Sequence, residues 1–234
     1  MFTVITRDLG QVTYPPVGRC IYCSKKTDSL QREHILAFGL SGTAILPKAS
    51  CGDCAKITGA LEEMVLRGPM WPLRVFRDLK SRTKHKDAPK TLPLTAIRRG
   101  EESTINLPID EYLILIMFPI FAPPASLFPE GYQQGINISG HATVSFGLRP
   151  EEVAAKLGAD QVRIEQEYRI AEFARVIAKI AYAFAFAEGA ADTLESPSPV
   201  IPAILGHCEE IGRWVGTMAP PQAHPGELHR LILH

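Results

Sequence analysis

A chain of 234 residues, 46% of them hydrophobic, can bury a substantial core, either as one large domain or as a small module joined to a core-bearing domain. Its 25 acidic residues balance its 25 lysines and arginines, which argues against a tight, non-specific coat on DNA. The first residues lack a basic start followed by an apolar run, so no secretory signal is predicted.

The first third of the chain is expected to hold an extended arm, a cysteine-rich segment and a helix. Residues 1–15 form the arm, with a short strand in 3–6, and residues 18–66 carry four of the five cysteines. A helix is predicted from residue 55 to 67, because Ile57, Leu61 and either Met64 or Val65 fall on one face at helical spacing.

The remaining chain is expected to form strands and helices of a second region that begins near residue 105. Strands are predicted within 103–121 and 136–148, a short helix within 150–158 and a terminal strand in 228–234. The apolar stretch 112–128 is broken by three prolines and is shorter than the roughly 20 residues of a membrane helix, so we interpret it as a buried strand and a turn, with no membrane contact.

The strongest helix prediction covers residues 160–189, whose apolar residues form a broad stripe that ends at Gly189. This stripe is interpreted as a core face, and it could also form the contact of a homodimer. The positions in the stripe are Ile170, Phe173, Ala174, Ile177, Ile180, Ala181 and Phe184.

The four clustered cysteines form two Cys-x2-Cys pairs, Cys20/Cys23 and Cys51/Cys54, with 27 residues between the pairs. This spacing is typical of two knuckles that close on one tetrahedral Zn²⁺. The chain is expected in the cytoplasm, where thiols stay reduced and such pairs indicate a metal rather than disulfides. The alternatives are unrelated buried thiols or a redox dithiol. Cys208 has no partner motif and is predicted to be a core thiol.

Between the two knuckles, the stretch "REHILAFGLSG" is followed by "LPKASCGDC", which opens the predicted helix. This order of knuckle, acid-His-Ile, glycine-containing turn and second knuckle resembles the HNH endonuclease family, over roughly residues 18–66. The resemblance implies a ββα-metal fold that grips one catalytic divalent cation and hydrolyses phosphodiester bonds. His34 would be the general base, and Glu33 would hold Mg²⁺ or a similar hard cation through oxygen.

Two departures from the family pattern bear on catalysis. The residue after the second knuckle, usually Asn or His in this family, is Ala55, so the third cation ligand is unknown. The polar residue that orients the histidine has no clear counterpart. Ser41 and Thr43 are possible substitutes for it. Four other residues could reach a metal but match no motif position: Asp53, Thr58, Glu62 and Glu63.

The segment 67–99 contains ten lysines and arginines and only two acidic residues. Most such runs are solvated faces, but cations that neutralise phosphates supply sequence-independent affinity for nucleic acid. Six cations that follow the predicted helix are therefore predicted to bind nucleic acid: Arg74, Arg77, Lys80, Arg82, Lys84 and Lys86.

These observations predict an α+β protein in three parts. A zinc-stapled, HNH-like module with its arm spans 1–66, a basic connector spans 67–104, and an α+β domain of unknown role spans 105–234. The leading functional hypothesis is a metal-dependent endonuclease, with structural Zn²⁺ and catalytic Mg²⁺, acting on nucleic acid, with DNA favoured over RNA. The alternative is a catalytically degenerate zinc module that binds nucleic acid or a protein partner without cleavage.

Overall fold

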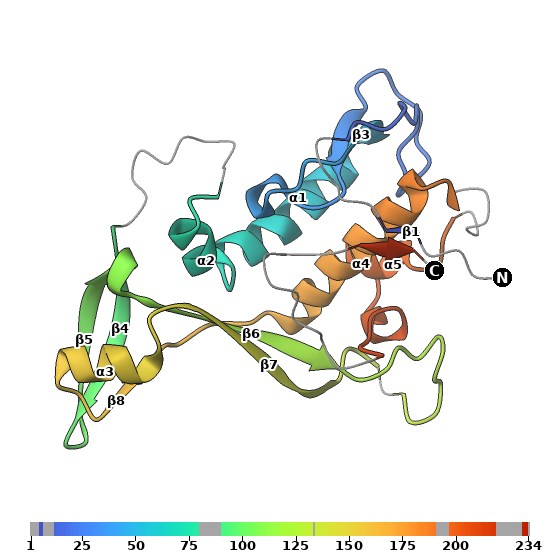
Figure 1. Ribbon diagram of the computed structural model, residues 1–234. Helices are drawn as coiled ribbons and strands as arrows, with labels where there is room; N and C mark the ends of the chain where they lie inside the picture. The colour runs from blue at the N-terminus through green and yellow to red at the C-terminus, as the bar shows by residue number, and fades with distance from the viewer. Residues whose placement is uncertain are drawn as a thin grey trace.

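The computed structural model describes residues 5–6, 12–79, 90–132, 134–190, 197–218 and 231–233 (Figure 1). The prediction of a mixed α and β protein is confirmed. The helices are α1 (Gly52–Arg67), α2 (Trp71–Phe76), α3 (Pro150–Leu157), α4 (Ile170–Ala187) and α5 (Ile201–Leu205). The strands are β1 (Ile5–Thr6), β2 (Gln31–His34), β3 (Ile45–Ser50), β4 (Thr91–Arg98), β5 (Glu101–Pro108), β6 (Leu113–Phe121), β7 (Ile138–Gly147), β8 (Gln161–Arg163) and β9 (Ile232–Leu233). Short 3-10 turns are η1 (Phe38–Leu40), η2 (Ile109–Glu111) and η4 (Ile211–Arg213).

The cysteine-rich segment folds as an antiparallel hairpin followed by a helix. β2 pairs with β3, with a shift of register between Gln31 and Glu33. Cys51 is extended at the start of α1, and the helix runs sixteen residues to Arg67. The helix predicted over 55–67 is confirmed, and it begins earlier, at Gly52. Its buried side chains Thr58, Leu61 and Val65 lie at helical spacing on one face.

The other strands form three small sheets. β4 lies between β5 and β8, β6 pairs with β7, and β1 pairs with β9 near the two ends of the chain (Figure 1). The strands expected within 3–6, 103–121, 136–148 and 228–234 are thus confirmed. The helix over 150–158 is confirmed as α3, which ends at Gly158 in a left-handed conformation.

The helix predicted over 160–189 is partly wrong, because α4 begins only at Ile170. Residues 161–163 form β8, which pairs with β4. From Gln161 to Ile170, exposed and half-buried residues alternate with a period of two, as on a strand with one covered face. Val162 and Ile164 supply that covered face and pack against the core that contains β4 and β6.

Two clusters of buried side chains make up the core, and α4 contacts both of them. The first joins the cysteine-rich segment to α4, α5 and η4. The second joins the end of α1 to α2, α3 and the strands β4, β5 and β6. Phe173 and Ile180 of α4 pack against both clusters. Figure 1 shows α1 and α4 side by side at the centre of the molecule.

The segment predicted as a basic connector contributes to this second cluster where the structure describes it. Leu73 of α2 and Leu92 and Leu94 of β4 are buried there. The proposed domain boundaries at 66 and 104 are not tested by this packing and stay a prediction. Among the described residues, none of the helices combines the length and the apolar character that a membrane crossing requires.

A candidate metal centre beside a buried charge cluster

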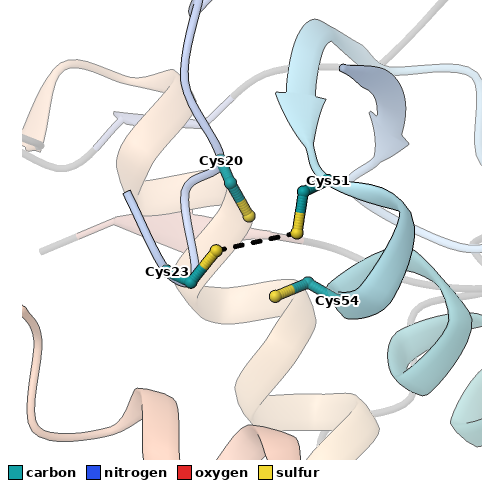
Figure 2. Close-up of side chains that lie close together, drawn as sticks. All are labelled: Cys20, Cys23, Cys51 and Cys54. Carbon is teal, nitrogen blue, oxygen red and sulfur yellow. Dashed lines mark hydrogen bonds between the residues drawn. The ribbon is translucent and has the colours of Figure 1, made fainter. Parts of the chain in front are cut away.

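The four cysteines of the two knuckles converge on one point. Cys20 and Cys23 stand on a tight turn, closed by hydrogen bonds from the N–H of Ser24 to the Cys20 carbonyl and from the N–H of Cys20 to the Lys25 carbonyl. Cys51 ends the hairpin and Cys54 lies in the first turn of α1. Their Sγ atoms all lie within 4.8 Å of one another and are turned toward a common centre (Figure 2).

This arrangement fits a zinc ion. A tetrahedral Zn²⁺ with bonds of about 2.3 Å holds its sulfurs about 3.8 Å apart. The Sγ atoms of Cys23 and Cys51 are separated by 3.6 Å, and all four cysteines are free thiols rather than disulfides. Cys20, Cys51 and Cys54 are buried and Cys23 is exposed, so the site is closed on most sides, as structural zinc sites are. Four cysteines close enough to hold a zinc ion are therefore established by the structure.

The surroundings of Cys51 also lower the pKa of its thiol, which favours the thiolate that binds a cation. Burial alone would raise the pKa of Cys51, but the backbone N–H of Cys54 and the neighbouring thiols outweigh burial and lower that pKa to about 7. Burial raises the pKa of Cys23 and of Cys54. Because zinc is bound by thiolates, its binding must release the protons that these two groups retain.

Glu33 and His34, the two residues predicted to carry catalysis, both lie inside the protein. Glu33 is 5% exposed and His34 is 6% exposed. Neighbours on a strand point to opposite faces, so β2 is covered on both sides at this end. The ring of His34 lies edge-on to Phe38, with centroids 6.0 Å apart. Neither side chain is on an open surface.

The carboxylate of Glu33 contacts Lys179, a residue that the sequence analysis did not select. The ammonium of Lys179 lies 2.7 Å from an oxygen of Glu33 and 2.7 Å from an oxygen of Glu62. It also donates to the backbone carbonyl of His34 and lies 3.4 Å from that of Ile35. Lys179 is 1% exposed, and it reaches this point from α4.

Burial and the charges of this cluster shift the pKa values of its members. Burial raises the pKa of Glu33, although the ammonium of Lys179 partly opposes the shift. Burial lowers the pKa of Lys179, but the carboxylates of Glu33 and Glu62 outweigh it, so the pKa is raised overall. Burial, and then the charges of both carboxylates, raise the pKa of Tyr22. Lys179 is thus held as a cation between the carboxylates of Glu33 and Glu62.

Two further contacts connect α4 to the zinc knuckle and to the segment before it. The hydroxyl of Tyr182 donates to the carbonyl of Ile21, inside the first knuckle, at 2.6 Å. The hydroxyl of Tyr14 donates to Glu188, just after the end of α4, at 2.6 Å. The knuckle, β2 and α4 therefore form one packed unit.

The residues predicted to bind nucleic acid are placed in different ways. Arg74 is 7% exposed, and its guanidinium donates to the carbonyls of Gly39 and Leu66 at 2.9 and 3.1 Å. It thereby connects η1 to the end of α1. Arg77 is exposed and lies 5.4 Å from the centre of the Phe146 ring. Four of the predicted residues lie outside the described residues: Lys80, Arg82, Lys84 and Lys86.

The positions of Cys208 and Ala55 bear on two other expectations from the sequence. Cys208 is exposed, so its prediction as a core thiol is wrong. It follows Gly206, whose left-handed conformation ends α5 and directs the chain to the surface. Ala55 lies in the first turns of α1, where its methyl group offers no ligand atom.

Comparison with protein-family models, with curated proteins and with solved structures yields no match for this chain. The likeness to HNH endonucleases therefore depends on the motif residues alone.

Lys179 could have been suspected from the sequence. It is the one lysine inside the long apolar run "ARVIAKIAYAFAFA", and a buried lysine requires an acidic partner. Which acid it would meet could not be read from the sequence, because the two carboxylates come from distant parts of the chain.

Proposed function

We propose that this protein is a zinc-stapled, HNH-like module that binds nucleic acid without cleaving it. The HNH-like reading is supported by the hairpin β2–β3 followed by α1, with two knuckles at its ends and Glu33–His34 on β2. Of the two hypotheses from the sequence, the non-catalytic one is favoured.

The observation that carries this choice is the ammonium of Lys179 at 2.7 Å from Glu33. A catalytic cation must use the carboxylate that the ammonium contacts, and it must also touch a phosphate of the substrate. Lys179, Glu33 and His34 are all at most 6% exposed, so a polymer backbone cannot reach this carboxylate or the imidazole in this conformation. Ala55 removes a further ligand position that the family pattern supplies.

Binding to nucleic acid is supported by exposed cations on the cysteine-rich segment and α1. They come from every part of the module: Lys26 after the first knuckle, Arg32 on β2, Lys48 on β3 and Lys56 on α1. Arg77 adds an exposed guanidinium after α2. Side chains of this kind neutralise phosphates, and each contact adds to the salt dependence of affinity.

Two measurements on the zinc-loaded protein test this function. Fluorescence anisotropy with labelled single- and double-stranded DNA and RNA should show binding that weakens with salt, with a slope of about 0.9 per neutralised phosphate for duplex DNA. Lys48→Glu with Lys56→Glu should reduce the affinity at least tenfold. Lys156→Glu is the matched control on α3 and should have little effect. An absence of binding at low salt would refute the proposal.

Cleavage by His34 is the second candidate, and the placement of Glu33–His34 on a strand next to α1 favours it. Plasmid and single-stranded substrates are incubated with Mg²⁺ or Mn²⁺, beside His34→Ala. We expect no difference between wild type and variant. Cutting that disappears in His34→Ala would establish the nuclease instead.

A further inference from the structure

The buried ammonium of Lys179 contacts four oxygen atoms, and we call the space that they enclose the Lys179 pocket. Two are carboxylate oxygens, from Glu33 on β2 and Glu62 on α1, and two are backbone carbonyls, of His34 and Ile35. Glu33 is 5% exposed and the side chain of Glu62 is 16% exposed, so water is largely excluded. Carboxylates and backbone carbonyls are the ligands that hard divalent cations take in proteins.

The formal charge of the pocket also matches a divalent cation better than it matches an ammonium. Two carboxylates face one ammonium, which leaves one negative charge in excess. A cation of charge two would balance both carboxylates. Such a cation could not enter while the four-carbon stem and ammonium of Lys179 fill the space.

The occupant of the pocket belongs to a different part of the chain from its walls. The walls come from β2, the residue after it and α1, whereas Lys179 lies on α4, 145 residues after His34. Tyr182 fixes the next turn of α4 to the carbonyl of Ile21 in the first knuckle. The docking of α4 therefore determines whether the pocket is filled.

We propose that Glu33, Glu62 and the carbonyls of His34 and Ile35 form a second cation site, separate from the four cysteines, and that Lys179 is its tethered occupant. When the ammonium is removed, a hard divalent cation of the Mg²⁺, Mn²⁺ or Ca²⁺ class binds there. This inference deepens the proposed function and rests on it for the absence of a catalytic cation. Its test contains no nucleic acid, so the two can fail separately.

The test uses Lys179→Ala in the full-length, zinc-loaded chain, with Mn²⁺ as the probe. Truncation to alanine removes the ammonium and leaves room for an ion and its waters. Electron paramagnetic resonance of free Mn²⁺ measures binding, and zinc content is measured in parallel. We expect one Mn²⁺ per chain in Lys179→Ala, binding at least tenfold weaker in wild type, and a rise in Tm of the variant with Mn²⁺. Lys179→Ala with Glu62→Gln is the matched control and should lose at least tenfold of the Mn²⁺ affinity.

Each outcome decides the inference. A folded Lys179→Ala that retains its zinc and binds Mn²⁺ no better than wild type overturns it. Mn²⁺ binding that survives in the Glu62→Gln control overturns it too, since the ion would then lie elsewhere. If Lys179→Ala folds only with Mn²⁺ or Mg²⁺ present, the inference is supported. If the variant stays insoluble with every divalent cation, the inference is refuted, because a filled site would compensate both carboxylates.

Discussion

Replacing Lys179 by methionine should be among the most damaging single changes in the protein. Methionine keeps much of the stem but leaves the buried carboxylates of Glu33 and Glu62 without a cation. Removing one partner of a buried ion pair costs about 3–5 kcal/mol. The side chain of Glu33 is 6% exposed and that of Glu62 is 16% exposed, so Glu33 should account for most of the loss. We expect a loss of about 4 kcal/mol, out of a total stability of about 5–15 kcal/mol for a typical domain.

Urea unfolding followed by circular dichroism measures this loss. With a slope of about 2–3 kcal/mol per molar urea, the midpoint should fall by about 1.3–2 M. Lys156→Met is the matched control, because Lys156 and Glu111 form an ion pair at 2.8 Å with side chains 49% and 39% exposed. Such an exposed pair contributes about 0–1 kcal/mol, so this control should move the midpoint little.

The triple variant Lys179→Met, Glu33→Gln, Glu62→Gln separates charge from packing. It should regain most of the lost stability, because an all-neutral set buries no uncompensated charge. The cost of Lys179→Met alone should also shrink as the pH falls. A buried carboxyl with a raised pKa is destabilising above its unfolded pKa and is relieved as it takes up a proton. The reasoning is wrong if Lys179→Met costs under about 1 kcal/mol, or if the triple variant is no more stable than the single one.

The remaining predictions concern the metal, the knuckle, the backbone and pH. Chelation of zinc, or Cys54→Ser, should abolish a one-to-one zinc content, measured by elemental analysis. It should also unfold the hairpin and α1 together, measured by circular dichroism. A chelated protein with unchanged Tm would contradict this. Tyr182→Phe removes the hydrogen bond to Ile21 and should cost about 1 kcal/mol and speed zinc loss to a colorimetric chelator; unchanged zinc release would exclude the coupling. Lys48 has φ 49° within β3. Lys48→Gly should therefore raise the urea midpoint by relieving about 1 kcal/mol of left-handed backbone strain. A lowered midpoint would show that the Lys48 side chain stabilises the fold by more than this strain costs. The pKa values of Lys179 and Tyr182 are raised in the folded protein. Their contribution to folding stability is therefore complete below the unfolded pKa values of about 10 and is lost as the pH rises above those values. Tm should fall above pH 10, and it should fall less in Lys179→Met.

Features set by local sequence were predictable. The knuckle spacing brought four sulfurs together because each pair needs only one tight turn. Helices with clear ends were also found, as in α3, which starts at Pro150 and stops at Gly158. The helix prediction fails at residues 160–169 because this alternating stretch directly precedes the helix α4. Its charged residues hid the period of two that Val162 and Ile164 reveal.

Features set by distant contacts were not predictable. Glu33 was expected to hold a metal because the motif around it is local, whereas its ion-pair partner is on α4. Glu62 was only one of several acids in the module. Its spacing from Thr58 and Val65 places it beside the buried face of α1, unlike the exposed Glu63, but that spacing does not tell which residue it meets. Arg74 was grouped with the basic residues that follow it, yet it is buried against η1 and α1.

The two proposed cation positions, at the four cysteines and at Glu33 with Glu62, obtain their positive charge in different ways. The four cysteines become thiolates when an ion binds them, so the charge at this position would depend on metal supply. The carboxylates of Glu33 and Glu62 receive their positive charge from Lys179, and this position depends only on the docking of α4. Under the proposed function, this region stays folded without Mg²⁺ and brings no Mg²⁺ to a phosphate while α4 is in place. Any activity toward a phosphodiester at Glu33 would therefore require α4 to move first, so cleavage and loss of the Tyr182–Ile21 hydrogen bond should occur together or not at all.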